Sequence, residues 1–433
     1  MNRHLIVVSV DAMVYEDLEL LRTLPNVGRL IADGSIVQKV TTIYPSLTHP
    51  VHATLMTGCP AGKTGIFNNT LFKPGEKSAP WFNSLNQLRC ETIFHAAHRA
   101  GLTTAACRWP LTAGGFDQID YLVPEIMDED VAAEPNLEKL YRKACSPGLF
   151  DAILHRHTSL LDAPERHPAY EEFSMRCAAD IIREYRPNLL MTHPGMVDHC
   201  RHVSGLFSPQ VDEALRMTDR WIGLLMDAVR DAGIEDSTSF AIVSDHGHME
   251  WVRAVALNVL FRQRGLLDID ADGQLVDWQI YAKSSGLSCQ IHVKDPAREA
   301  EFGQLLTELA KTGLYGFGEV LTRAECEARY GLSGPFSFVL EGDGYTQFTS
   351  DCTGKLMRPF EPAGCGLHHS SHGHMPERGP QPPMILCGPA FARGITIERE
   401  SILNEAPLFA AALGLTLPEA CGTVPQPLAA AWR

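Results

Sequence analysis

Short apolar segments that each run into acidic residues or histidines are the feature that most constrains the fold of this chain. Residues 5–10 precede Asp11, residues 240–244 precede Asp245, and residues 188–192 are followed by further acidic and histidine residues. Short, nearly continuous apolar runs are typical of strands buried on both faces, as in a parallel sheet covered by helices. Because polar residues beyond the carboxyl ends of parallel strands gather at one edge of an open α/β sheet, we expect a site at that edge.

Helical stretches alternate with these strand candidates. Residues 15–32 have the spacing of an amphipathic helix. Thr48 opens a shorter helix, with Pro50 in its first turn and Gly58 near its end. The alternation predicts an α/β fold, in which a central, mostly parallel sheet is flanked by helices.

The sequence pattern between about residues 257 and 347 differs from the alternation of strands and helices before it. An Asp-rich turn at 268–273 is followed by alternating segments, and residues 299–311 have helical spacing. We therefore expect an inserted, smaller α+β subdomain at 258–347, which interrupts a core formed by residues 1–257 and 348–433.

The composition narrows the classes of partner. The net charge of −15 at pH 7 argues against binding to a nucleic-acid duplex or to an anionic membrane. A phosphorylated substrate is compatible with this charge, because bound metal ions can reverse the local field at a site. No segment approaches the ~20 apolar residues of a membrane helix, and no signal-peptide pattern is present. Since the 12 cysteines are also scattered singly, we expect a cytoplasmic protein with reduced cysteines.

Acidic residues and histidines recur in clusters that suit a pair of divalent metal ions. Zinc accepts nitrogen and oxygen ligands, and two zincs about 4 Å apart can clamp the attacking and leaving oxygens of a displacement at phosphorus. Such a site needs several Asp and His side chains and a hydroxyl nucleophile. The candidates are Asp11, Thr48 within residues 45–52, the pair Asp198 and His202, the pair Asp245 and His246, and a histidine-rich segment at 368–374.

Each candidate taken alone has an ordinary structural explanation. Asp11 and Thr48 suit the capping of a helix. Asp198 and His202, four residues apart, suit an ion pair on one helix face. It is the clusters together, in a fixed order along the chain, that favour a metal site.

Eight short motifs in this order resemble the type I phosphodiesterase/nucleotide pyrophosphatase family of the alkaline phosphatase superfamily across nearly the whole chain. Any one of them is weak evidence, whereas their shared order and spacing are specific. The motifs are Pro45-x-x-Thr48-x-Pro50-x-His52, Thr57-Gly58, Gly65-Ile66-x-x-Asn69, Trp109-Pro110, Asp198-x-x-x-His202-x-x-Gly205, Ser244-Asp245-His246-Gly247, His372-Gly373 and Gly388-Pro389-x-Phe391.

The resemblance implies an alkaline-phosphatase-like core, two Zn²⁺ per chain and a role for each matched residue. Thr48 would be the nucleophile that forms a phospho-threonine intermediate, and Asn69 would donate to a non-bridging phosphoryl oxygen. The implied zinc ligands are Asp198, His202 and His372 for one ion, and Asp11, Thr48, Asp245 and His246 for the other.

The segment around the nucleophile departs from the nucleotide-cleaving members of that family. These commonly place Lys before the threonine and Phe after it, whereas this chain has Leu47 and His49. His49 is therefore a candidate substrate contact of different chemistry. We expect zinc-dependent cleavage of a small phosphorylated substrate, a phosphodiester or a phosphoanhydride.

Three questions stay open at this level. A similar Ser-x-Thr-x-Pro segment occurs in phosphonoacetate hydrolases, so cleavage of a carbon–phosphorus bond is an alternative activity. A non-catalytic phosphate-ligand-binding protein on the same fold is an alternative of another class. The oligomeric state is undetermined, with a homodimer as one alternative.

Overall fold

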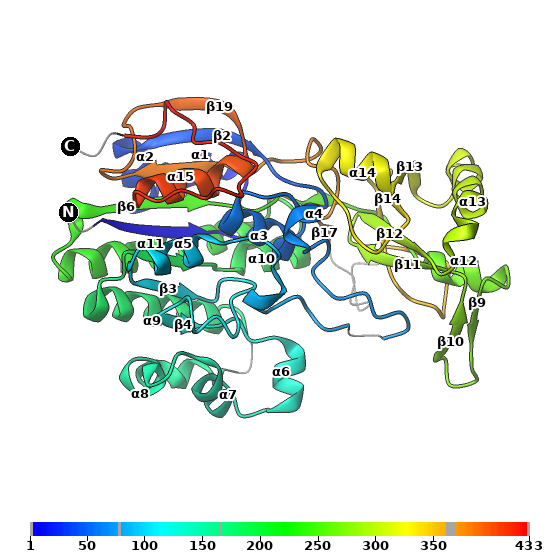
Figure 1. Cartoon of the computed structure of the whole chain (residues 1–433), viewed down its shortest axis with the longest axis horizontal. Helices are drawn as coiled ribbons and strands as arrows, with labels where there is room; N and C mark the ends of the chain where they lie inside the picture. Colours follow the sequence, from blue (N-terminus) through cyan, green and yellow to red (C-terminus); the bar gives the residue numbers. More distant parts are fainter. Residues whose placement is uncertain (1–2, 77–78, 164–165, 361–368, 431–433) are drawn as a thin grey trace.

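The computed structural model describes residues 3–76, 79–163, 166–360 and 369–430, and it is built around one eight-stranded sheet (Figure 1). The strand order is β19-β2-β18-β6-β1-β5-β3-β4, and only β18 runs against its neighbours. The predicted α/β fold with a central, mostly parallel sheet is thereby confirmed. The strands are β1 (His4–Ser9), β2 (Ser35–Thr41), β3 (Thr104–Cys107), β4 (Tyr121–Val123), β5 (Leu189–Thr192), β6 (Thr238–Val243), β18 (Met384–Cys387) and β19 (Thr396–Ser401).

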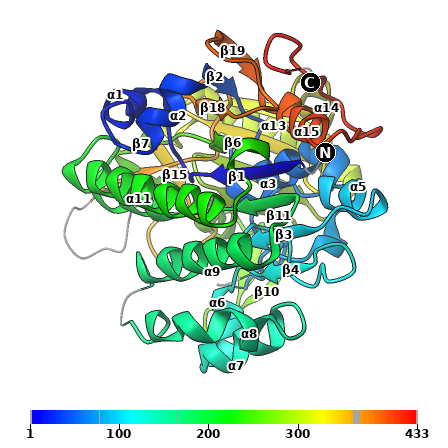
Figure 2. The same ribbon diagram turned by 90° about the vertical axis from the view of Figure 1, so that its left-hand side faces the viewer.

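Helices cover both faces of this sheet (Figure 2). Successive side chains of a strand point to opposite faces, so a strand that is apolar throughout needs cover on both. Leu5 and Val7 of β1 belong to the apolar cluster on one face, while Ile6 and Val8 belong to the cluster on the other. The first cluster includes residues of α3 (Thr48–Thr57), α5 (Ile93–Arg99) and α15 (Glu405–Ala412), and the second includes residues of α2 (Val27–Asp33), α9 (Ala169–Tyr185) and α11 (Pro209–Asp231).

The single helix predicted at residues 15–32 is wrong. The structure has η1 (Tyr15–Asp17), α1 (Leu18–Leu21) and α2, with a break after Leu21. Pro25 accounts for the break, because it has no N–H for the helical ladder and disfavours helical backbone at the residue before it.

The helix predicted to open at Thr48 is present as α3. It begins at Thr48 and ends at Thr57, and Gly58 follows with φ +68°. A left-handed residue after the last turn favours glycine. A side chain there would also collide with the C-terminal segment, since an added Cβ would lie 2.8 Å from the Ala420 Cβ.

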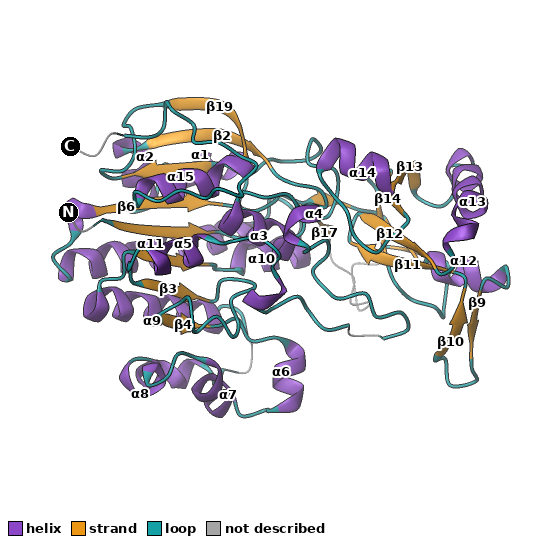
Figure 3. Ribbon diagram, in the orientation of Figure 1, coloured by secondary structure: helices purple, strands orange, loops and turns teal. Residues whose placement is uncertain are grey.

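A second, antiparallel sheet lies beyond the carboxyl ends of the central strands, on the right of Figure 1 and of Figure 3. Its order is β11-β12-β14-β13, and it packs with α13 over a separate apolar cluster that includes Phe302 and Leu306. This arrangement places α+β structure within the predicted insert, whose limits at 258–347 stay a prediction. The elements are α12 (Leu257–Gln263), β9 (Leu267–Ile269), β10 (Leu275–Trp278), β11 (Ile280–Ser285), β12 (Ser288–Val293), α13 (Glu299–Lys311), β13 (Phe317–Thr322), α14 (Arg323–Tyr330) and β14 (Phe338–Gly342).

Short elements complete the described chain. Its eleven cysteines are free, and eight of them are buried. Among the helices described, none is both long and apolar enough to cross a membrane. The short elements are α4 (Ala61–Thr64), η2 (Leu85–Gln87), α6 (Asp128–Ala133), α7 (Leu137–Ala144), α8 (Leu149–Ala152), η3 (Leu154–Leu160), α10 (Met196–Ser204), η4 (Glu235–Ser237), β7 (Met249–Glu250), β8 (Arg253–Val255), η5 (Pro296–Arg298), β15 (Thr346–Phe348), β16 (Met357–Pro359), β17 (Ser370–Ser371) and η6 (Ile402–Asn404).

Candidate active site

The carboxyl ends of β1 and β6 bring the first group of predicted residues together. These strands are parallel neighbours in register, so the residues that follow them emerge at the same sheet edge. Asp11 follows β1, and Asp245 and His246 follow β6. The Asp245 carboxylate also accepts the backbone N–H of Ala12 at 3.1 Å, which ties the two strand ends to each other.

Asp11, Asp245 and His246 form a compact buried set. Each offers a ligand atom, and these atoms all lie within 4.8 Å of one another. The Thr48 hydroxyl lies 3.2 Å from His246 Nε2. The structure therefore gathers around one point the four residues that the resemblance assigns to one cation.

A second set adjoins the first and shares His246 with it. Ligand atoms of Asp198, His246, His248 and His372 lie within 4.8 Å of one another. His202 borders this set, because α10 places it on the same helix face as Asp198, with Nε2 3.4 Å from Asp198 Oδ2. The three residues predicted for the other cation thus lie together, whereas His368 falls outside the described residues.

His248 belongs to the second set and was not predicted from the sequence. Its Nε2 lies 2.6 Å from Asp198 Oδ1, and its Nδ1 lies 3.0 Å from the Ser370 hydroxyl. A histidine at this position can bind a cation or orient the carboxylate that does so. Its sequence signal was a second histidine just after the Ser244-Asp245-His246-Gly247 motif, which is hard to separate from an ordinary core histidine.

The electrostatics of the two sets suit divalent cations. Burial raises the pKa of Asp11 well above its usual range, and the charges of Asp198 and Asp245 add to this effect. Burial likewise raises the pKa of Asp245 to about 6. Asp11 Oδ1 and Asp245 Oδ2 are buried without a hydrogen-bond partner among the described residues. Crowded carboxylates with unused acceptor atoms, next to histidine nitrogens, form the ligand set that zinc-type cations accept.

A further histidine, His193, lies behind Asp11. Its Nε2 is 3.2 Å from Asp11 Oδ2, and its Nδ1 is 2.9 Å from the carbonyl oxygen of Ser9. This pairing fixes the ring and the carboxylate relative to β1. His193 follows β5, so it also belongs to the strand-end pattern, although the sequence did not single it out.

Thr48 stands where a phosphoryl group would meet oriented donors. It is the first residue of α3, and the amino end of a helix favours anions. The Asn69 side-chain oxygen accepts the backbone N–H of His49 at 3.0 Å, which fixes the amide next to Thr48. The role of Asn69 as a donor to a phosphoryl oxygen stays a prediction.

His49 is buried beside the nucleophile with both ring nitrogens unpaired among the described residues. Its ring centroid lies 4.8 Å from that of Trp81, and its Nε2 lies 3.7 Å from Glu125 Oε2. Burial lowers the pKa of His49 well below its usual range. The role of His49 as a substrate contact stays a prediction, and Trp81 and Glu125 were not predicted as its neighbours.

Arg108 and Glu125 extend the strand-end pattern to β3 and β4. Arg108 Nη1 lies 2.6 Å from Glu171 Oε1, and Arg108 Nε lies 3.9 Å from Glu125 Oε1. Arg108 has φ +55°, a backbone conformation that non-glycine residues rarely adopt and that is enriched at functional sites. Both residues directly follow apolar segments, which is the signal that could have identified them.

Comparisons with known proteins agree with the motifs. A family model, type I phosphodiesterase/nucleotide pyrophosphatase, matches residues 5–337. A venom phosphodiesterase of Naja atra is 25% identical over 255 residues, which cover 56% of this chain and 26% of that protein. Ectonucleotide pyrophosphatase/phosphodiesterase family member 1 of Mus musculus is 24% identical over 230 residues, covering 52% of this chain and 21% of that protein. The chain spans about a quarter of the length of these relatives.

Solved structures share the fold. Murine ectonucleotide pyrophosphatase/phosphodiesterase 5 has a TM-score of 0.67 at 18% identity, covering 99% of this chain and 100% of that chain. An inactive threonine-to-alanine variant of the murine protein, in complex with AMP, has a TM-score of 0.66 at 18% identity and covers 97% of each chain. Because the family model matches most of the sequence, this chain belongs to the type I phosphodiesterase/nucleotide pyrophosphatase family.

Proposed function

We propose that this protein hydrolyses a phosphodiester or phosphoanhydride bond of a small substrate, with Thr48 as nucleophile and two zinc ions as cofactors. One observation carries the proposal. The Thr48 hydroxyl, at the amino end of α3, lies 3.2 Å from the Nε2 atom of His246, the residue that the two candidate metal sets share.

The residues divide the chemistry among them. Asp11, Asp245 and His246 would hold a cation next to Thr48, and Asp198, His202 and His372 would hold the other, with His248 against Asp198. Bound divalent cations lower the pKa of a neighbouring hydroxyl and offset the charge that develops on phosphoryl oxygens. Asn69 and the amino end of α3 would orient the phosphoryl group.

The reaction proceeds in two displacements. Attack of Thr48 Oγ1 on phosphorus forms a phospho-threonine and releases the first alcohol or phosphate group. Water then attacks the phospho-threonine, which releases the second product and restores the hydroxyl. AMP bound to the murine relative supports nucleotides as one substrate class, although His49 alters the surroundings of the nucleophile.

Replacement of the nucleophile tests this proposal. We expect Thr48→Ala to retain bound zinc and to lose turnover of bis(4-nitrophenyl) phosphate by about three orders of magnitude or more. Thr48→Ser, which keeps a hydroxyl at this position, is the matched control and should retain measurable turnover. Near-normal activity of the alanine variant would reject Thr48 as nucleophile.

The competing activity, cleavage of phosphonoacetate, is separated by the product. The zinc-loaded protein should release nitrophenol from the diester faster than it releases phosphate from phosphonoacetate. The opposite ranking would assign the site to carbon–phosphorus bond cleavage.

A further inference from the structure

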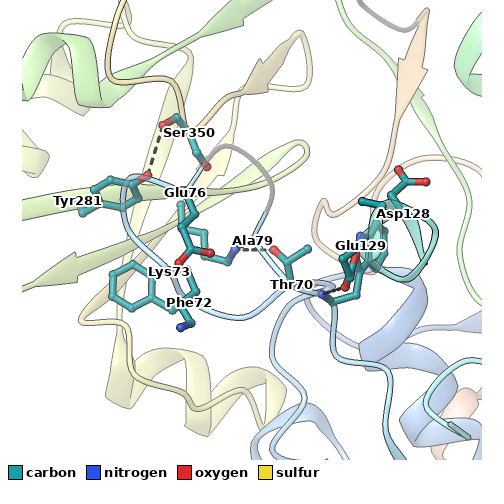
Figure 4. A pocket seen from close by; sticks show the side chains of 12 residues that line it. Thr70, Phe72, Lys73, Glu76, Ala79, Asp128, Glu129, Tyr281 and Ser350 are labelled. Atoms are coloured by element: carbon teal, nitrogen blue, oxygen red, sulfur yellow. Dashed lines mark hydrogen bonds between the residues drawn. The ribbon is translucent and has the colours of Figure 1, made fainter. Parts of the chain in front are cut away.

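A cavity of about 540 Å³ opens between the loop that follows Asn69 and the β11 strand of the second sheet (Figure 4). Thr70, Phe72, Trp81, Tyr281 and Lys283 are among its lining residues. It adjoins the candidate active site, because Thr70 follows Asn69 directly and Trp81 contacts the His49 ring. His49 and Asn69, which lie beside Thr48, thus connect the cavity to the candidate active site.

Lys283 brings a buried positive charge into the cavity. Only 7% of the residue is exposed. Its ammonium donates to the Thr70 hydroxyl at 2.6 Å and to the Leu71 carbonyl oxygen at 3.2 Å. An ammonium has three N–H donors, so these two neutral acceptors leave one donor in excess.

Lys283 has no carboxylate partner within ion-pair distance in the described parts of the chain. Burying a charge is costly unless an opposite charge compensates it. Burial also lowers the pKa of Lys283 to about 8, a value at which the ammonium still predominates at neutral pH. An anion in the cavity would supply the missing compensation.

The carboxylates around the cavity do not cancel this charge. Glu76, Asp128 and Glu129 are exposed, so water and salt screen them. Asp128 already pairs with Arg166, and the Glu129 carboxylate accepts the Trp81 backbone N–H at 2.9 Å. The buried part of the cavity is therefore electropositive, while its rim is mixed in charge.

We propose that Lys283 binds an anionic group, a carboxylate or a phosphate, on a substituent of the phosphate that Thr48 attacks. The aromatic side chains of Phe72, Trp81 and Tyr281 would line the path of the connecting atoms. In this way the second sheet takes part in selecting the substrate. The inference rests on the proposed function for the position of the scissile phosphate.

Binding to the zinc-loaded Thr48→Ala variant tests the inference without turnover. The probes are methyl 4-nitrophenyl phosphate and three analogues that carry one more anion, namely methyl 3-carboxy-4-nitrophenyl phosphate, 2-carboxyethyl 4-nitrophenyl phosphate and 2-phosphonoethyl 4-nitrophenyl phosphate. A hydrogen bond to a charged group should make at least one analogue bind about 10-fold tighter than the methyl ester, as measured by calorimetry. The analogue that gains affinity identifies the substituent that enters the cavity.

Two substitutions at Lys283 separate anion binding from a structural role. Lys283→Gln keeps a donor for Thr70 and Leu71 but removes the charge, so the advantage of the anionic ester should shrink to less than about threefold. Lys283→Arg keeps the charge and should preserve most of the advantage. Lys73, an exposed residue that lines the same cavity, provides the control, and Lys73→Gln should leave the advantage unchanged.

The inference is overturned if no anionic ester binds tighter than the methyl ester, or if the advantage survives Lys283→Gln. Turnover by the wild-type protein is measured separately. If the charged ester binds through Lys283 but wild type hydrolyses none of the four esters, the proposed function fails while the anion site stands. If wild type hydrolyses the esters but their binding shows no dependence on Lys283, the anion site fails while the proposed function stands.

Discussion

The two sides of the candidate site are built in different ways. The candidate metal-binding side gathers residues from the segments after β1, β5 and β6 of the central sheet, together with Thr48 of α3 and His372 after β17. The bond from Ala12 to Asp245 ties two of these strand ends to each other. The proposed recognition side comes from residues 70–76 and 79–81, which pack against β11, and 213 positions of sequence separate Thr70 from Lys283. The first side is therefore tied to the fold itself, whereas the second can change its chemistry with little effect on the central sheet.

This contrast predicts separable effects of substitution. Changes on the metal-binding side should lower the metal content of the protein and therefore reduce turnover of every substrate. Changes on the recognition side should alter the ranking of substrates and leave the metals in place. Three substitutions probe the separation, in order of decreasing effect.

The largest effect is expected for Asp245→Asn, which removes a carboxylate from the metal-binding side. We expect loss of bound metal and a fall in activity of about three orders of magnitude or more. Metal analysis measures the bound metal, and turnover of the diester measures the activity. Asp268→Asn, at an exposed position on β9, is the control. Full metal occupancy in Asp245→Asn would show that the site does not depend on this carboxylate.

The same substitution should stabilise the metal-free protein. Burial raises the pKa of Asp245 from 3.8 to about 6 in the folded state, so between these values the folded state binds more protons than the unfolded state. The stability contributed by this group therefore falls as the pH rises from about 4 to about 6. Asp245→Asn should remove this fall in stability between pH 4 and pH 6. Thermal unfolding of the metal-free wild-type and variant proteins at pH 4 and pH 7 measures the difference. An unchanged pH dependence would contradict this.

A smaller effect is expected for His248→Ala. Loss of a group that holds a metal-binding carboxylate typically weakens metal affinity by about 10- to 100-fold. Competition with a chelator measures the zinc affinity, and His98→Ala, exposed on α5, is the control. Zinc affinity equal to that of wild type would place His248 outside the metal-binding side.

The smallest effect is expected for His49→Phe, at a residue of α3 whose ring contacts Trp81 of the recognition side. An aromatic ring at this position should improve stacking with a nucleobase, worth about a 2- to 10-fold rise in kcat/KM for the 4-nitrophenyl ester of thymidine 5′-phosphate. The methyl 4-nitrophenyl ester, which has no base, should change less, and zinc content should stay the same. A parallel change for both esters, or a loss of zinc, would show that the two sides are coupled here.

Local patterns in the sequence were sufficient for the central fold, whereas the candidate metal ligands were named only through the order of motifs shared with the family. The apolar run before Asp11 predicted a buried strand, and Thr48, Pro50 and Gly58 marked the start and end of α3. These elements could be predicted because apolar runs and helix-capping residues are patterns of residues close together in the chain. The prediction for residues 15–32 was wrong because the break at Pro25 outweighed the helical spacing on either side.

Some parts of the site could be recognised only in three dimensions. His248 stood next to a motif, yet only its 2.6 Å contact with Asp198 distinguishes it from a core histidine. Arg108 and Glu125 followed apolar segments, but their proximity depends on the order of β3 and β4 in the sheet. A pattern of residue types does not contain the register that decides such contacts.

By itself, the sequence determined the α/β core, the strand-end positions of Asp11 and Asp245, and the helix that begins at Thr48. The tertiary structure alone decided that His246 belongs to both candidate metal sets and that the Lys283 ammonium donates to the Thr70 hydroxyl across the cavity. The physical reason is the range of the interactions involved. Apolar periodicity and capping residues are local signals within a few positions of the chain, whereas the partner of a buried charge is set by which distant segments pack together.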